Sequence, residues 1–210
     1  MKKLSLTLFV LVGLVVAAVV AGRLLTPWMD RYGATDAELA AVLPGDELVP
    51  DPASFVNRAI TIHASPEAIY PWLLQLDAEK GGWYSYDWLE TNLLRCPMTN
   101  ADRIHPEWQD RRVGDVVRMC PGESGPPPFT VAQLHPNRAM VMGHQEEGVW
   151  VDLYQFVIAP QDDGTSRLLL RTRTMMTGGL WDVIHPGVFI MELGLLNGVK
   201  MRAEALAQTR

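Results

Sequence analysis

The feature that most constrains the fold is a run of short strand-like segments, separated by turns, that precedes one long helical segment. Strand patterns are predicted at residues 113–120, 128–134, 139–144, 149–159 and 167–176. The separators carry turn residues, such as Pro121-Gly122 and Asp162-Asp163-Gly164. Because these separators are short, we expect the strands to pair as antiparallel hairpins.

Helical and strand patterns flank this run on both sides. A strand is predicted at Val56–His63, and Ser65-Pro66 then starts a helix over Pro66–Asp77. A second short helix is predicted at Ser85–Leu94, and helical spacing returns over Pro186–Gln208. This order predicts an α+β domain in which a curved antiparallel sheet wraps around the long terminal helix, with room for a cavity between them.

The N-terminus carries a long apolar stretch. Leu4–Gly22 has no charged residue, and its length suffices to cross a hydrocarbon core of about 30 Å at about 1.5 Å per residue. The alternative is a cleaved secretory signal ending near Val19-Val20-Ala21. We favour an uncleaved anchor, because the run exceeds the roughly 7–15 residues of a signal core. Either hypothesis predicts an extracytoplasmic domain, since Lys2 and Lys3 precede the stretch.

Three parts of the chain follow from this pattern: an anchor or signal at 1–23, a tether at 24–55 and the main domain at 56–210. The tether is rich in proline and holds a short helix candidate at Asp36–Val42. Without Lys2, Lys3 and Arg23, the rest has 15 basic and 24 acidic residues, a formal charge of −9. So acidic a domain argues against nucleic acid as a partner.

The two cysteines, Cys96 and Cys120, are 24 positions apart and lack metal-ligand spacing, so no metal site is predicted. An oxidising compartment would favour a disulfide between them, and the alternative is two small buried side chains. Nucleotide-binding loops, GxSxG and HExxH are all missing from the sequence, so no cofactor and no catalytic residue set is predicted. Whether the protein is an enzyme stays open, with binding favoured over catalysis.

One segment is unusually aromatic. GGWYSYDWLE, residues 81–90, places Trp83, Tyr84, Tyr86 and Trp88 beside Asp87. Aromatic rings with polar tips suit the wall or mouth of a ligand cavity, and Tyr86 and Asp87 are therefore candidate ligand-binding residues.

The terminal helix and the last strands supply further candidates. Glu192 falls on the same helical face as Leu195 and Val199, and a carboxylate there needs a hydrogen-bonded or cationic partner. Arg171 and Arg173, which share a strand face, are the expected partners; solvation of Glu192 at the edge of the sheet is the alternative. The remaining cavity candidates lie on two strands: Met140, Met142, Trp150 and Tyr154. For the candidates on each strand, the alternative is that the side chains simply fill the core.

Histidines 105 and 144 are the candidate acid–base groups by residue type, and Asp87 or Asp152 is the expected orienting carboxylate. His105 precedes Pro106 in a loop, where a structural role is favoured.

The chain resembles the START-like superfamily, also called SRPBCC, which includes polyketide cyclases and lipid-transfer domains. Within it, the chain is similar to a largely uncharacterised bacterial, mostly actinobacterial, subset with an N-terminal hydrophobic segment. The resemblance is carried by residues 33–36 (GATD), 43–47 (LPGDE), 66–76, 84–90 (YSYDWLE), 101–104 (ADRI), 106–109 (PEWQ) and 113–115 (VGD). It implies a helix-grip fold with a pocket, and no shared catalytic residues.

These observations lead to three functional hypotheses. The first is a membrane-anchored START-like domain that binds a hydrophobic small molecule, such as a lipid or polyketide, between the terminal helix and the sheet. The second is a cyclase- or hydratase-type enzyme that uses the same cavity. The third is an anchored interaction domain whose core is filled by its own side chains.

Overall fold

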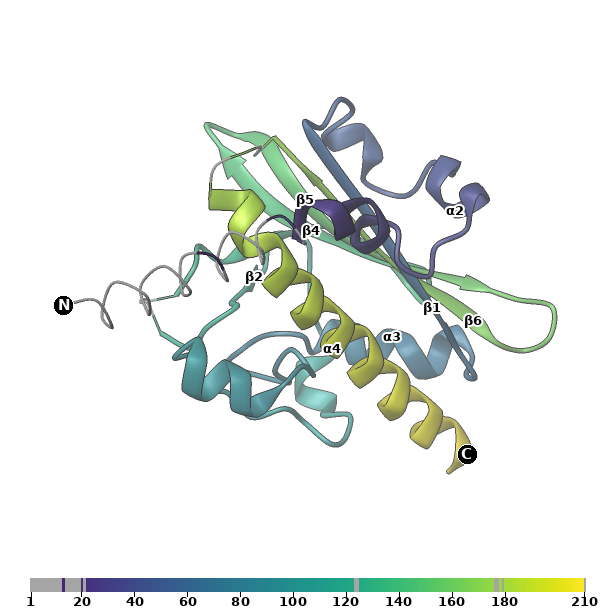
Figure 1. Ribbon diagram of the computed structural model, residues 1–210. Helices are drawn as coiled ribbons and strands as arrows, with labels where there is room; N and C mark the ends of the chain where they lie inside the picture. Colours follow the sequence, from purple (N-terminus) through teal and green to yellow (C-terminus); the bar gives the residue numbers. More distant parts are fainter. Residues whose placement is uncertain are drawn as a thin grey trace.

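The computed structural model describes residues 13, 20, 22–122, 125–175, 178 and 180–209. Among them, six strands form one antiparallel sheet in the order β1-β6-β5-β4-β3-β2, so the first strand pairs with the last (Figure 1). The strands are β1 (Ser54–Ile62), β2 (Val116–Val117), β3 (Phe129–His135), β4 (Ala139–Glu146), β5 (Val149–Pro160) and β6 (Ser166–Thr174).

Helices lie on both sides of this sheet. The long α4 (Leu180–Gln208) and α3 (Pro66–Leu74) cover one face, and α2 (Asp36–Ala40) lies beyond the other (Figure 1). Residues 22–30 are also helical, and three single turns complete the order: η1 (Asp46–Leu48), η2 (Leu89–Leu93) and η3 (Pro106–Trp108). The predicted α+β class, with an antiparallel sheet and a long terminal helix, is confirmed.

The main core lies between the sheet and helices α3 and α4. Ile69 and Leu73 of α3, Leu196 and Val199 of α4 and Phe156 of β5 are fully buried in one apolar cluster. They meet because apolar residues recur every three or four positions on each helix and every second position on the strand. We call the sheet face that carries this cluster the inner face.

The opposite, outer face of the sheet is covered by the segment that follows α2. Leu43 packs against Ala59, Val157 and Leu169, and Val49 packs in a second small cluster on the same face. Residues of the predicted tether therefore bury a sheet face that would otherwise expose apolar side chains to water.

Three predicted elements differ from the structure in extent. The strand expected at 113–120 shrinks to β2, because the carbonyl of Arg118 accepts from the Ala78 N–H and from Trp83 Nε1 instead of a neighbouring strand. The expected short helix at 85–94 is a π-helical turn over Leu89–Leu93. Helix α4 begins six residues before Pro186, which lies inside it and lacks the N–H that would bond four residues back.

The predicted membrane anchor, residues 1–23, lies outside the described residues except at positions 13, 20, 22 and 23. Among the described parts of the chain, no helix combines the length and the apolar character needed to cross a bilayer.

Candidate functional site

A buried polar network links the first half of α4 to the inner face of the sheet. Its centre is Glu192 on α4, which is 4% exposed. Glu192 Oε1 accepts a hydrogen bond of 2.8 Å from Tyr154 Oη on β5, and Glu192 Oε2 forms an ion pair with Arg58 Nη1 on β1. The carboxylate predicted to face the sheet therefore does so, and it is paired rather than solvated.

The partner predicted for Glu192 was wrong. The residue that pairs with it is Arg58, whereas Arg171 and Arg173 point to the outer face of the sheet. Strand parity explains the difference: Arg58 shares its face with Val56, Ile60 and Ile62, and this face turns toward α4. The signal available in the sequence was one arginine among apolar residues at alternate positions of β1.

Arg58 also connects the network to the N-terminal helical segment. Its Nε donates to the carbonyl of Met29 at 2.8 Å, and its guanidinium lies 5.1 Å from the centre of the Phe189 ring. Arg58 Nη2 lies 3.4 Å from His185 Nε2, and that nitrogen lies 2.8 Å from Asp30 Oδ1. The network thus runs from β5 through α4 and β1 to residues 29 and 30.

Burial shapes the charges in this network. It lowers the pKa of Arg58 to about 10, an effect that the nearby Tyr154 and Asp30 oppose, so the guanidinium stays protonated at neutral pH. Burial also raises the pKa of the Tyr154 phenol, which therefore remains a neutral hydrogen-bond donor. The site presents a fixed cation, a carboxylate and a hydroxyl inside an apolar surrounding.

Aromatic rings surround the network on the inner face. The Tyr154 ring stacks on Phe129 at 5.5 Å and meets Phe156 at 5.4 Å and Trp83 at 6.3 Å edge-on. The predicted cavity residues Met140, Met142, Leu195 and Val199 lie in the same apolar cluster, each at most 3% exposed. The structure therefore brings five of the predicted residues and Glu192 to one interface.

Arg171 and Arg173 instead bind the segment after α2 that covers the outer face of the sheet. Arg171 Nη1 pairs with Asp46 Oδ2 at 2.6 Å and donates to the carbonyl of Ala41 at 2.9 Å. Arg173 donates to the carbonyls of Val49 and Pro50 at 2.7 and 2.6 Å. Both arginines are buried. Their hydrogen bonds to backbone carbonyls hold residues 41–50 against the outer face of the sheet.

Trp150 also lies on the outer face, where it packs against the cluster of Val49, Val141 and Leu153. The sequence alternation predicted it beside Tyr154, and this was wrong. The register between β4 and β5 shifts where Gln145 pairs with Trp150 and His144 pairs with Asp152. Because β5 has one extra residue at this bulge, the β5 residues before it point to the opposite sheet face from the one that simple alternation predicts.

His144 and Asp152 do lie together, as the sequence hypothesis required. His144 Nδ1 lies 2.8 Å from Asp152 Oδ2, and Nε2 lies 3.0 Å from the carbonyl of Pro127. Hydrogen bonding to Asp152 raises the pKa of His144, with burial opposing. Both ring nitrogens are therefore engaged, one by a carboxylate and the other by a backbone carbonyl. His105 has a structural role too, since its ring stacks on Trp108 at 4.0 Å.

Tyr86 and Asp87 lie at the surface beside α4. Tyr86 is 46% exposed, and its ring lies against Gly194, where no Cβ would fit. Asp87 is exposed and accepts a hydrogen bond from Asn100 Nδ2. Their neighbour Glu90 is buried. Burial and the nearby Asp87 raise the pKa of Glu90 to about 7, against a hydrogen bond with the Asn100 side chain that lowers it.

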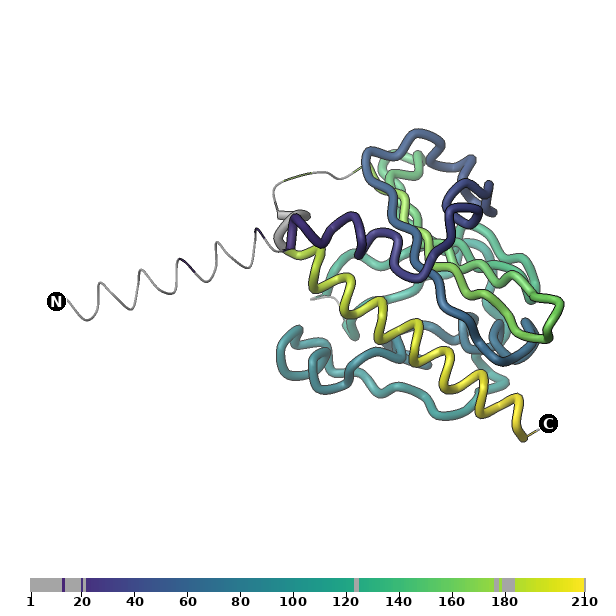
Figure 2. Tube along the Cα trace, turned by 45° about the vertical axis from the view of Figure 1, so that its right-hand side comes forward, coloured from purple at the N-terminus to yellow at the C-terminus, as the bar shows by residue number. Residues whose placement is uncertain are grey.

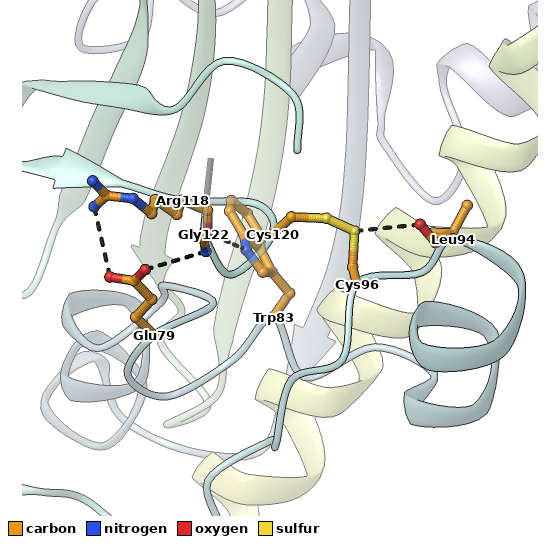
Figure 3. The surroundings of a disulfide bond; sticks show 7 residues. All are labelled: Glu79, Trp83, Leu94, Cys96, Arg118, Cys120 and Gly122. Carbon is orange, nitrogen blue, oxygen red and sulfur yellow. Dashed lines mark hydrogen bonds and ion pairs between the residues drawn. A yellow bond between two sulfur atoms is a disulfide. The ribbon is translucent and has the colours of Figure 1, made fainter. Parts of the chain in front are cut away.

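A disulfide joins this segment to the strand region opposite. Cys96 and Cys120 are bonded, with their Cα atoms 5.0 Å apart, which decides between the two alternatives that the sequence left open. Trp83 lies beside the bridge, and Glu79 contacts both Arg118 and the Gly122 N–H (Figure 3). The disulfide therefore holds the 85–96 segment next to the aromatic rings of the inner face.

A separate groove of about 580 Å³ opens at the other end of β5. It is lined by Val42, Leu43, Pro44, Pro66, Glu67, Asn137, Arg138, Val157, Ile158, Ala159 and Pro160. None of the predicted ligand-binding residues lines it. In the described ranges, no group of three or more His, Cys, Asp and Glu side chains is arranged to hold a metal ion.

The topology and the site define a helix-grip type of α+β domain. No family model matches the sequence, and a search of curated proteins found no match either. Among solved structures, the chain is similar to the self-sacrificing resistance protein CalC from Micromonospora echinospora, with 10% identity over 74% of this chain and 97% of that one (TM-score 0.48). Protein Ms6760 from Mycobacterium smegmatis is 14% identical over 74% and 91% of the two chains, respectively (TM-score 0.44). Aha1 from Colwellia psychrerythraea is 17% identical over 71% and 98% (TM-score 0.40). At these scores we assign the fold class from the topology of this chain.

Proposed function

We propose that this chain is a membrane-anchored START-like domain that binds a hydrophobic small molecule between α4 and the inner face of the sheet. Tyr154, Glu192 and Arg58 would contact the polar group of that molecule, and the surrounding apolar side chains would contact its body. The ligand class is a lipid or polyketide-like compound, because a long apolar part and one polar group match the composition of the interface.

The observation that carries the proposal is the charge pair within the core. Burying Arg58 and Glu192 costs several kcal/mol for each ion before their attraction offsets it, and apolar side chains of similar size would fold at least as well. A buried ion pair is therefore more typical of a binding or catalytic site than of a purely structural core. Tyr154, the hydrogen-bond partner of Glu192, keeps part of its surface accessible, so a ligand would meet the pair from this side.

Two features support the proposed location. The uncharged stretch Leu4–Gly22 is long enough to span a bilayer, and it lies directly before the described residues of the domain in the sequence. The Cys96–Cys120 disulfide suits an oxidising compartment, so an extracytoplasmic domain on a single-pass anchor agrees with it.

A specific observation favours a second candidate, the interaction domain with a filled core. Four predicted cavity residues are at most 3% exposed and belong to one packed apolar cluster: Met140, Met142, Leu195 and Val199. If these side chains keep their positions, a ligand would have to displace them to enter this part of the interior. The enzyme hypothesis has less support, since both ring nitrogens of His144 are engaged.

Native mass spectrometry of the full-length protein, extracted in detergent, tests the proposal. We expect a co-purifying small molecule, and a rise in melting temperature when members of a lipid panel are added. Tyr154→Phe should weaken binding by about tenfold, because a hydrogen bond near a charged group is lost. Tyr70→Phe is the matched control, since Tyr70 is a buried tyrosine of the same core on α3.

Two results would contradict the proposal. One is the absence of both a bound molecule and any thermal shift across the panel, which would favour the filled core. The other is equal ligand retention in Tyr154→Phe and Tyr70→Phe, which would place the ligand elsewhere.

A further inference from the structure

The helical residues 22–30 pack directly against the first half of α4. A Cβ on Gly22 would lie 3.3 Å from Pro186 Cγ, and the Trp28 ring lies 5.3 Å from Phe189. The carbonyl of Met29 also accepts a hydrogen bond from the buried Arg58. The uncharged stretch ends at Gly22. Consequently, the described residues that directly follow the proposed membrane span, from Gly22 on, are already packed on the folded domain.

The segment 85–94 borders the same half of α4 from the other side. Ser85 Oγ donates to the carbonyl of Met191 at 3.1 Å, and the Tyr86 ring lies against Gly194. Figures 1 and 2 both show the first turns of α4 between the purple residues 22–30 and the teal segment around residue 90. The Cys96–Cys120 disulfide fastens the end of this segment.

Large apolar side chains on these three segments are exposed. Leu24 is 77% exposed, Trp88 71% and Leu93 65%. Trp28, Leu94 and Ile190 are also exposed. We call these six residues, which lie on α4 and on the two segments that flank its first half, the docking face. Isolated exposed apolar residues are ordinary, whereas their recurrence on all three segments is the feature that needs a partner.

The contacts of α4 place the docking face near the end of the proposed span. Pro186 lies next to Gly22, at which the uncharged stretch ends, and Met191, which Ser85 contacts, lies five residues further along the helix, a rise of about 8 Å. Headgroup layers are roughly 5–8 Å thick on each side of the hydrocarbon core. Trp28 and Trp88 suit this depth, because tryptophan prefers the membrane–water interface.

We propose that the docking face rests on the bilayer that holds the N-terminal span, with Trp88 and Leu93 entering the headgroup region. This inference rests on the proposed anchoring and names the surface through which the domain contacts the membrane. It turns the end of the domain nearest Glu192 toward the lipid, since Glu192 follows Met191 on α4. A hydrophobic ligand would then pass between bilayer and site with little exposure to water.

Quenching of tryptophan fluorescence by brominated lipids tests the docking. The full-length chain is reconstituted into phosphatidylcholine vesicles with and without bromine on the acyl chains. We expect Trp88→Phe to lose part of the quenched fluorescence. Trp108→Phe is the matched control and should lose none, because Trp108 stacks on His105 in the turn next to α3. Both changes keep an aromatic ring, and Trp88 is exposed, so folding should not suffer.

Vesicle flotation separates the two possible failures. A chain that does not float with the vesicles overturns both the anchor and the docking. A chain that floats, and in which Trp88→Phe loses no more quenched fluorescence than Trp108→Phe, overturns the docking alone. Leu93→Asn provides a second variant: we expect it to reduce the quenching of Trp88 in the floated protein, and unchanged quenching counts against the proposed insertion.

Discussion

Replacing Glu90 with glutamine tests the electrostatics of the η2 segment. Glu90 is 1% exposed and Asp87 is close by, and a hydrogen bond with the Asn100 side chain offsets only part of their effect. These conditions disfavour the ionised form, so the pKa of Glu90 rises from its ordinary 4.5 to about 7. Glutamine keeps the shape of the side chain and removes the charge.

The sign of the pH effect follows from proton binding. Between pH 4.5 and about 7, the folded state holds a proton that the unfolded state has released, so stability falls as the pH rises through this window. Below pH 4.5 the charge contributes nothing, and above pH 7 its full cost is present. A shift of this size corresponds to about 3 kcal/mol as an upper bound. For a chain of this length, that amounts to a melting-temperature change of roughly 6–12 °C.

Thermal unfolding of the full-length protein in detergent, measured from pH 4.5 to 8.5, checks this prediction. We expect Glu90→Gln to melt close to the wild type at pH 4.5 and several degrees above it at pH 8.5. Glu47→Gln is the control with the opposite sign, because the backbone N–H of Glu47 and the side chain of Gln133 lower the pKa of that carboxyl. If the difference between Glu90→Gln and wild type does not change with pH, Glu90 is not desolvated as described and the reasoning fails.

Two further predictions concern charges outside the network. Asp46→Asn should lower the free energy of unfolding by about 3 kcal/mol, because it leaves the buried Arg171 without its carboxylate, whereas Asp36→Asn at the exposed Arg31 pair should cost under about 1 kcal/mol. Urea unfolding of both variants measures this, and equal losses would contradict the role of Asp46. Asp152 raises the pKa of His144, so the stability that this pair contributes is present in full below pH 6.5 and is lost as the pH rises through the folded pKa. His144→Gln should therefore lower the melting temperature more at pH 5.5 than at pH 9, and an equal effect at both would argue against a charged histidine.

Much of the fold could be predicted because it depends on local patterns. Strands β3 to β6 and helix α3 lie close to their predicted positions, since alternation, helical spacing and turn residues are properties of neighbouring positions. The extent of β2 could not be predicted, because it depends on where the Arg118 carbonyl finds its donors, 35 and 40 residues away in the chain.

The candidate site shows the same division. The helical face that Glu192 shares with Leu195 and Val199 made an inward carboxylate one of two alternatives, and the structure bears it out. Its partner Arg58 did not follow, because the pairing of β1 with β6 decides which sheet face turns toward α4. Trp150 was misplaced by one bulged residue, which alternation along a single strand cannot reveal.

The sequence by itself determined the element order and the uncharged N-terminal stretch, and it marked Glu192 as a carboxylate among apolar residues of α4. These depend on short-range spacing, which the covalent chain carries directly. Only the tertiary structure decided the partner of Glu192, the attachment of residues 41–50 by Arg171 and Arg173, and the pairing of the two cysteines. Each of these contacts joins residues that are far apart in the chain, so no local pattern of residues reveals them.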